Sequence, residues 1–127
     1  MNICPFCVLD STCIIASNAH AYAICDGYPI SVGHALILPK RHIASLFETT
    51  SEERNALLDL LANVKTELII KHKPDGFNIG INDGLAAGQT VMHLHIHLIP
   101  RYAGDTEDPR GGVRWIMPEK APYWKKL

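Results

Sequence analysis

Three histidines alternate with apolar residues in the last third of the chain. His93, His95 and His97 occur in the run Met-His-Leu-His-Ile-His-Leu-Ile. This period of two is typical of a β-strand, in which the three imidazoles would share one face at a spacing of roughly 6.6 Å. Such a row can bind a metal, relay protons, or attack an electrophile while a neighbouring imidazole protonates the leaving group. A polar, solvent-facing strand is the alternative, and the strict alternation of three histidines disfavours it.

A pair of cysteines near the beginning of the chain is the second set of chemically capable residues. The segment Cys4-Pro5-Phe6-Cys7 has the spacing of half a structural zinc site. A thioredoxin-like redox pair has the same spacing, but it normally lies between a strand and a helix of a βαβ unit. Here the pair precedes every core segment. The chain has no other close pair of cysteines, so we expect any further zinc ligands to be imidazoles.

The patterns around these residues predict one helix and a set of antiparallel strands. Thr50 and Glu53 form a capping box, leucines recur at helical spacing after them, and Pro74 forbids continuation. A turn at 27–29 joins the first two strands as a hairpin with a loop of about six residues. The fold class is therefore α+β, with the helix on one face of the sheet and the histidines on the other. We expect strands at residues 20–26, 33–39, 76–82 and 93–99, a helix at residues 51–71, and Phe77, Ile79 and Ile81 facing that helix.

Length and composition limit the classes of function. A chain of 127 residues with 47% hydrophobic and 20% charged residues is typical of one soluble globular domain. The formal net charge of −1 gives no support for binding nucleic acid or an anionic membrane. No apolar run approaches the roughly 20 residues that span a bilayer. With no signal-peptide pattern at the N-terminus, we expect a cytoplasmic protein whose four cysteines form no disulfides.

Residues 93–99 match the pattern His-φ-His-φ-His-φ-φ, in which φ is an apolar residue. The pattern resembles the signature of the histidine triad (HIT) family of nucleotide hydrolases and transferases. The lead-in Ala87–Val91 is also similar to that family, and the similarity extends from Cys4 to about Tyr102. The resemblance implies a single HIT domain over residues 1–127, with a zinc knuckle at 1–13, about five strands, and a C-terminal loop and tail at 103–127. It also implies a homodimer whose two sheets join edge to edge.

The resemblance assigns the cysteine pair to a structural zinc site. In the zinc-bearing branch of the family, the metal ligands match Cys4, Cys7, His42 and His93. Four protein ligands leave no open coordination position, so the ion would stabilise the fold and take no part in the reaction.

Further residues match the family's nucleotide contacts, and adenine is the family's usual base. Asp26, eight positions before His34, matches a residue that contacts the ribose, although an aspartate there also suits a turn cap. Asn82, Gln89 and Thr90 flank the glycine-rich loop 83–88 and match phosphate and ribose contacts. Backbone amides of such a loop can themselves bind phosphate oxygens.

The implied reaction is displacement at the α-phosphorus of a nucleotide. His95 matches the family nucleophile, and His97 is placed to donate a proton or hydrogen bond to the leaving group. Gln89 would stabilise charge on the phosphate, and His34 would orient His95. Dinucleoside polyphosphates, nucleoside phosphoramidates and aminoacyl-adenylates are all substrates of relatives.

Two other classes of function stay open at the level of the sequence. One is a nucleotide-binding sensor or scaffold with little turnover, which the intact His95 disfavours. The other is a metalloenzyme in which all three histidines bind one ion. Imidazoles about 6.6 Å apart on a strand do not easily converge on bonds of about 2.1 Å, so we disfavour this class as well.

Overall fold

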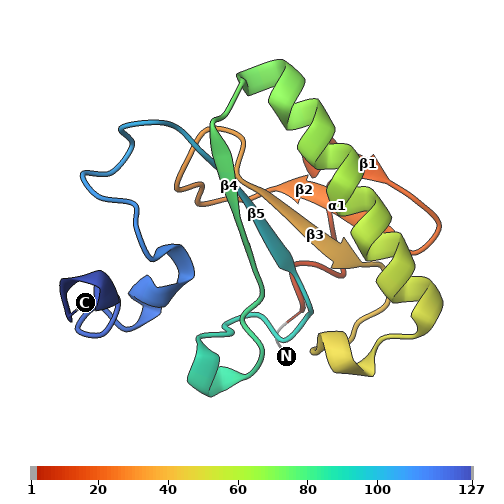
Figure 1. Cartoon of the computed structure of the whole chain (residues 1–127). Helices are drawn as coiled ribbons and strands as arrows, with labels where there is room; N and C mark the ends of the chain where they lie inside the picture. The colour runs from red at the N-terminus through yellow and green to blue at the C-terminus, as the bar shows by residue number, and fades with distance from the viewer. Residues whose placement is uncertain (1–2, 127) are drawn as a thin grey trace.

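The computed structural model describes residues 3–126, so Met1, Asn2 and Leu127 of the expected domain lie outside the described part. Five strands form one antiparallel sheet in the order β1-β2-β3-β5-β4, and one long helix packs on it (Figure 1). The predicted α+β architecture is confirmed. The elements are β1 (Ile14–Ser17), β2 (Ala21–Cys25), β3 (Ala35–Pro39), α1 (Ser51–His72), β4 (Gly76–Gly80) and β5 (Ile96–Arg101). Among the described residues, no helix is long and apolar enough to cross a membrane.

The helix begins and ends where its local signals predict. The Thr50 hydroxyl accepts the backbone N–H of Glu53, and the Glu53 carboxylate accepts that of Thr50, which completes the capping box. Lys73 has a left-handed conformation at the C-terminal end, before Pro74. One face of α1 packs on the sheet and forms the main core, which consists of Leu57, Leu60, Val64 and Leu68 with Ala21, Ala23, Ala35, Ile37, Leu94, Ile96 and Leu98.

The sheet face opposite α1, which we call the open face, is partly covered by the N-terminal segment. Ile24, Leu36 and Leu38 are buried on this face, and Phe6 and Leu9 pack against them. The cysteine pair at Cys4 and Cys7 therefore reaches the sheet because the apolar residue between them and another after them bury surface there.

The observed strands differ from the predicted ones in number and in their ends; β3 begins at Ala35 and β4 ends at Gly80, each inside the predicted bounds. Strand β1 was not located from the sequence, and β5 begins at Ile96, so His93 and His95 precede it. The backbone of Leu94 explains the late start, because its N–H donates to the carbonyl of Ile43 at 2.7 Å and makes no ladder bond there. Strand β5 then continues to Arg101 because β4 pairs with it to that residue. The β2–β3 hairpin is confirmed, with the longer loop 26–34.

The C-terminal segment, residues 103–126, contains two short 3-10 helices, Gly112–Ile116 and Tyr123–Lys126. It begins with a salt bridge between Arg101 and Asp105 at 2.7 Å. Figure 1 shows it lying beyond the edge strand β4, apart from α1. Residues 103–111 of the expected C-terminal loop and tail precede the first of these helices.

Candidate active site and metal site

Cys4, Cys7, His42 and His93 come together at one end of the sheet. Their ligand atoms all lie within 4.8 Å of one another. The Nδ1 atoms of His42 and His93 are 3.2 Å apart, and Cys7 Sγ lies 3.2 Å from the first and 3.6 Å from the second. Cys4 Sγ lies 3.5 Å from His93 Nδ1. The four residues that the sequence placed in one metal site are therefore neighbours in the fold.

The donor set and its spacing fit a tetrahedral zinc ion. Bonds of about 2.0–2.1 Å to nitrogen and 2.3 Å to sulfur put tetrahedral ligand atoms roughly 3.3–3.8 Å apart. The Nε2–H of His93 donates to the carbonyl of Pro39 at 2.8 Å, which leaves the Nδ1 lone pair facing the other ligands. Burial lowers the pKa of His93, so the imidazole is the neutral ligand form at pH 7.

Phe6 connects the cysteine pair to the histidine row. Its ring meets the imidazole of His93 edge-on at 5.9 Å between ring centroids, and that of His95 at 5.1 Å. The segment that carries the cysteines thus forms one wall beside His95. No local pattern indicates this contact, because Phe6 and His95 are far apart along the chain.

His95 presents one free ring nitrogen. Its Nδ1–H donates to the backbone carbonyl of His93 at 2.9 Å, so Nε2 carries the lone pair in the neutral ring. The residue is only 9% exposed. A buried neutral imidazole with a fixed tautomer and one unprotonated nitrogen is the form that attacks an electrophile.

His34 contacts His97, whose ring in turn meets that of His95 at 5.2 Å between centroids, so His34 would orient His95 only through His97. His34 Nδ1 accepts the backbone N–H of Ile30 at 3.2 Å, so the ring proton lies on Nε2. That Nε2 is 3.0 Å from His97 Nδ1 and 3.2 Å from a carboxylate oxygen of Asp26. The cause is sheet register: Leu36 pairs with His97, which places His34 diagonally across from His97 on the open face.

This network fixes which nitrogen of His97 can donate. Since His34 Nε2–H donates towards His97 Nδ1, the proton of neutral His97 lies on Nε2. Burial lowers the pKa of both His34 and His97, and Asp26 opposes this effect more weakly in each. Both rings are therefore neutral at pH 7.

Asp26 serves as the predicted turn cap and also faces the histidines. One carboxylate oxygen accepts the backbone N–H of Tyr28 at 2.8 Å. The other lies 3.2 Å from His34 Nε2 and 3.9 Å from His97 Nδ1. Of these three residues, Asp26 directly follows β2, His34 directly precedes β3 and His97 lies near the start of β5. Sequence spacing relates Asp26 to His34 but does not reveal that His97 joins them.

Gln89 braces the glycine-rich loop. Its side-chain oxygen accepts the backbone N–H of Gly84 at 2.8 Å, and its amide donates to the carbonyls of Ala44 and Val91 at 2.9 and 3.1 Å. At 4% exposure the side chain is turned inwards. Its effect on a bound phosphate would therefore act through the loop backbone. Thr90 is exposed and Asn82 half-buried at the two ends of the loop.

Comparison with known proteins identifies relatives over most of the chain. Residues 9–104 match the HIT domain family. A HIT-like protein of Mycoplasma genitalium is 36% identical over 103 residues, which are 78% of this chain and 73% of the relative. An adenylylsulfatase of Arabidopsis thaliana and an AP-4-A phosphorylase of Mycobacterium tuberculosis are each 35% identical, over 82% and 72% of this chain. The chain spans about half the length of these two, 55% and 48%.

Solved structures show the same fold. The NitFhit protein of C. elegans superposes with a TM-score of 0.75 at 33% identity, over 93% of this chain and 28% of the larger one. A zinc-bound histidine triad family protein of Mycobacterium smegmatis superposes with a TM-score of 0.66 at 30% identity, over 90% of this chain and 87% of that protein. A diadenosine triphosphate hydrolase of Plasmodium falciparum superposes with a TM-score of 0.70 at 28% identity, over 93% of this chain and 77% of that protein.

Proposed function

Because this chain belongs to the HIT family, we propose that it is a nucleotide hydrolase or nucleotidyl transferase that cleaves at the α-phosphorus of an adenylyl compound. The observation that carries the proposal is the state of His95, whose Nδ1–H is bound to a carbonyl and whose Nε2 is free to attack. The relatives support the substrate class: one is an adenylylsulfatase, one an AP-4-A phosphorylase and one a diadenosine triphosphate hydrolase.

In the first step, Nε2 of His95 attacks the α-phosphorus and forms an N–P bond. The P–O bond to the leaving group breaks, and its electron pair stays on the leaving oxygen. His97 stabilises that oxygen by a hydrogen bond from Nε2–H, in the tautomer that His34 enforces. A strongly basic leaving group depends most on this hydrogen bond, because its oxygen gathers the most negative charge as the P–O bond breaks.

In the second step, water attacks the phosphorus of the nucleotidyl-His95 intermediate. The N–P bond breaks with its electron pair returning to Nε2, and the water proton leaves to solvent. The products are a nucleoside monophosphate and the regenerated imidazole. Backbone amides of the loop 83–88, held by Gln89, and the side chains of Asn82 and Thr90 would position the phosphate oxygens.

A structural zinc ion on Cys4, Cys7, His42 and His93 is part of the proposal. The zinc-bound relative from M. smegmatis supports it, together with the fit of the four ligand atoms. When bound, the ion would tie the N-terminal segment to the sheet and so hold Phe6 against His95.

A purine nucleotide partner, a homodimer and a cytoplasmic location complete the proposal. Asp26 would accept hydrogen bonds from the ribose hydroxyls, since one of its oxygens faces the histidines on the open face. Free cysteine ligands suit a reducing compartment such as the cytoplasm. Gel filtration with light scattering would measure the dimer directly.

Trapping the intermediate tests the proposal. Protein quenched during turnover of an adenylyl substrate should carry one adenylyl group that is acid-labile and base-stable, on the peptide that contains His95. His95→Ala should abolish both the adduct and turnover while nucleotide affinity persists, and His20→Ala, at an exposed histidine outside the site, should change neither. An adduct on another residue, or substantial turnover by His95→Ala, would refute the assignment.

A further inference from the structure

The hairpin loop 26–34 carries the contact that fixes the tautomer of His34, yet its own side chains are poorly packed. Three of its apolar side chains lie mostly in water: Tyr28 is 90% exposed, Ile30 74% and Val32 64%. Apolar groups that stay in water gain no free energy from burial, so they do little to hold the loop in place. The position of the loop therefore depends on its polar contacts and on its two ends.

Tyr102 ties the second half of this loop to the sheet. Its hydroxyl donates to the carbonyl of Val32 at 2.7 Å, across 70 residues of sequence. Gly33, the next residue of the loop, packs closely on α1 and β5, since a Cβ there would come within 3.0 Å of His72 and 3.3 Å of Pro100. The hydrogen bond and this close packing together fix the part of the loop that leads into β3.

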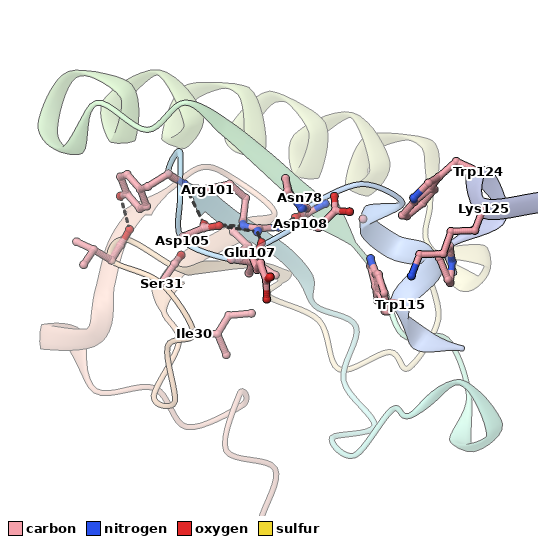
Figure 2. A pocket seen from close by; sticks show the side chains of 17 residues that line it. Ile30, Ser31, Asn78, Arg101, Asp105, Glu107, Asp108, Trp115, Trp124 and Lys125 are labelled. Carbon is pink, nitrogen blue, oxygen red and sulfur yellow. Dashed lines mark hydrogen bonds and ion pairs between the residues drawn. The ribbon is translucent and has the colours of Figure 1, made fainter. Parts of the chain in front are cut away.

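Tyr102 is itself held by a turn at the end of β5. Its backbone N–H donates to the carboxylate of Asp105 at 3.0 Å, and its carbonyl accepts the N–H of Asp105 at 2.9 Å. The same carboxylate binds the guanidinium of Arg101 at 2.7 and 2.8 Å. Figure 2 shows this pair at a cavity that Ile30 and Ser31 of the loop also line. The Tyr102 hydroxyl therefore projects towards the loop from an anchored backbone.

The loop that Tyr102 holds decides which nitrogen of His97 carries a proton. The Ile30 N–H donates to Nδ1 of His34 at 3.2 Å and keeps the proton of that ring on Nε2, a tautomer that Asp26, 3.2 Å from Nε2, also favours. Without the Ile30 contact, His34 can take its proton at Nδ1 and accept at Nε2. His97 would then donate from Nδ1, and its Nε2 would have no hydrogen for the leaving oxygen.

We propose that Tyr102 is a positioning residue for the departure of the leaving group. By holding the loop 26–34 through Val32, it keeps His34 and His97 in the tautomers that let His97 donate from Nε2. The inference rests on the proposed function for its kinetic consequence. The tautomers themselves belong to the free protein and are measured without any substrate.

Nitrogen NMR of the imidazole rings tests the tautomers directly. In wild-type protein, Nε2 of both His34 and His97 should have the chemical shift of a protonated nitrogen, and Nδ1 that of an unprotonated one. In Tyr102→Phe, which removes only the hydroxyl, both His97 nitrogens should move to intermediate shifts because two tautomers exchange. Tyr28→Phe is the matched control in the same loop, and its spectrum should equal that of wild type. Unchanged His97 shifts in Tyr102→Phe would overturn the proposal.

Turnover across a series of leaving groups tests the consequence. Tyr102→Phe should lower kcat about fivefold for strongly basic leaving groups, as loss of one neutral hydrogen bond predicts, and less than about twofold for activated esters. KM should not change, because the proposed nucleotide contacts stay in place. In a His34→Ala background the same substitution should have no further effect, because His34 connects the loop to His97.

Uniform slowing by Tyr102→Phe across all leaving groups, or an equal further loss in the His34→Ala background, would overturn the proposal, because Tyr102 would then support the fold in general. Failure of the two proposals is distinguishable. If the wild-type protein turns over no adenylyl substrate, the proposed function fails, and the NMR comparison still decides the tautomers. If it turns over substrate while the His97 shifts of Tyr102→Phe equal those of wild type, this inference alone fails.

Discussion

Replacing Cys7 by serine tests whether zinc holds the N-terminal segment to the sheet. Cys7 Sγ lies 3.2 and 3.6 Å from the two histidine nitrogens, so its thiolate would be one of the four ligands of the proposed zinc ion. Structural zinc sites contribute apparent binding free energies of about 10–16 kcal/mol, and one ligand in four corresponds to roughly 3 kcal/mol. At about 3–5 °C per kcal/mol for a chain of this size, Cys7→Ser should lower the Tm by about 10 °C.

The assay combines metal analysis, thermal unfolding and turnover on the same preparations. Wild-type protein purified without chelator should contain about one zinc per chain. Below the unfolding transition, Cys7→Ser should turn over substrate within a few-fold of wild type, because a closed site takes no part in the reaction. Cys13→Ser is the matched control, since Cys13 is exposed and outside the cluster, and its Tm should not change.

Three results would contradict this reasoning. One is a wild-type protein without zinc, and another is a disulfide between Cys4 and Cys7 in protein prepared from a reducing lysate. The third is an equal Tm loss in Cys7→Ser and Cys13→Ser, because the effect would then belong to thiol loss in general and not to a metal ligand.

Three further changes probe the site and the fold. His97→Ala should slow turnover most for substrates with strongly basic leaving groups and least for activated esters, in a kcat comparison across leaving groups; uniform slowing would contradict the donor role. Asp26→Ala should weaken ribonucleotide binding by about 1.5–3 kcal/mol and spare deoxyribonucleotides, measured by titration calorimetry; equal losses would mean that Asp26 only caps its turn and anchors His34. Arg41 and Thr50 lower the pKa of Glu53 to about 2 from 4.5, so Glu53 stabilises the fold above about pH 4.5 and loses this effect as pH falls towards 2. Glu53→Gln should therefore cost up to about 3 kcal/mol of unfolding free energy at pH 7, with the difference from wild type shrinking on acidification, and a pH-independent difference would refute the linkage.

The sequence predicted the elements better than their ends. Capping and leucine spacing located α1, because those signals are local. The start of β5 depends on a tether between Leu94 and Ile43, which no local pattern encodes. Strand β1 has only four residues, which is too short for its apolar pattern to be distinguished from that of the next strand, β2.

The candidate site was predictable in its membership and less so in its contacts. The two cysteines were visible from their spacing, whereas His42 and His93 were assigned through the family resemblance, and the structure brings all four together. Contacts between side chains depend on sheet register, which the sequence leaves open. The pairing of Leu36 with His97 therefore directs His34 to a different histidine from the one expected. The sequence does not show whether the side-chain amide of Gln89 binds substrate or backbone. In the structure Gln89 is buried, and its amide binds backbone groups.

The carbonyl that holds His95 has a consequence for the lifetime of the covalent intermediate. A carboxylate in that position would stabilise positive charge on the ring and raise its basicity, but the His93 carbonyl carries no net charge. The ring receives no negative charge at its Nδ1–H, so Nε2 departs from the phosphorus more readily than that of an imidazole paired with a carboxylate. The nucleotidyl-enzyme should accordingly hydrolyse faster than the same adduct on a carboxylate-paired imidazole, so trapping it requires a quench on the time scale of turnover.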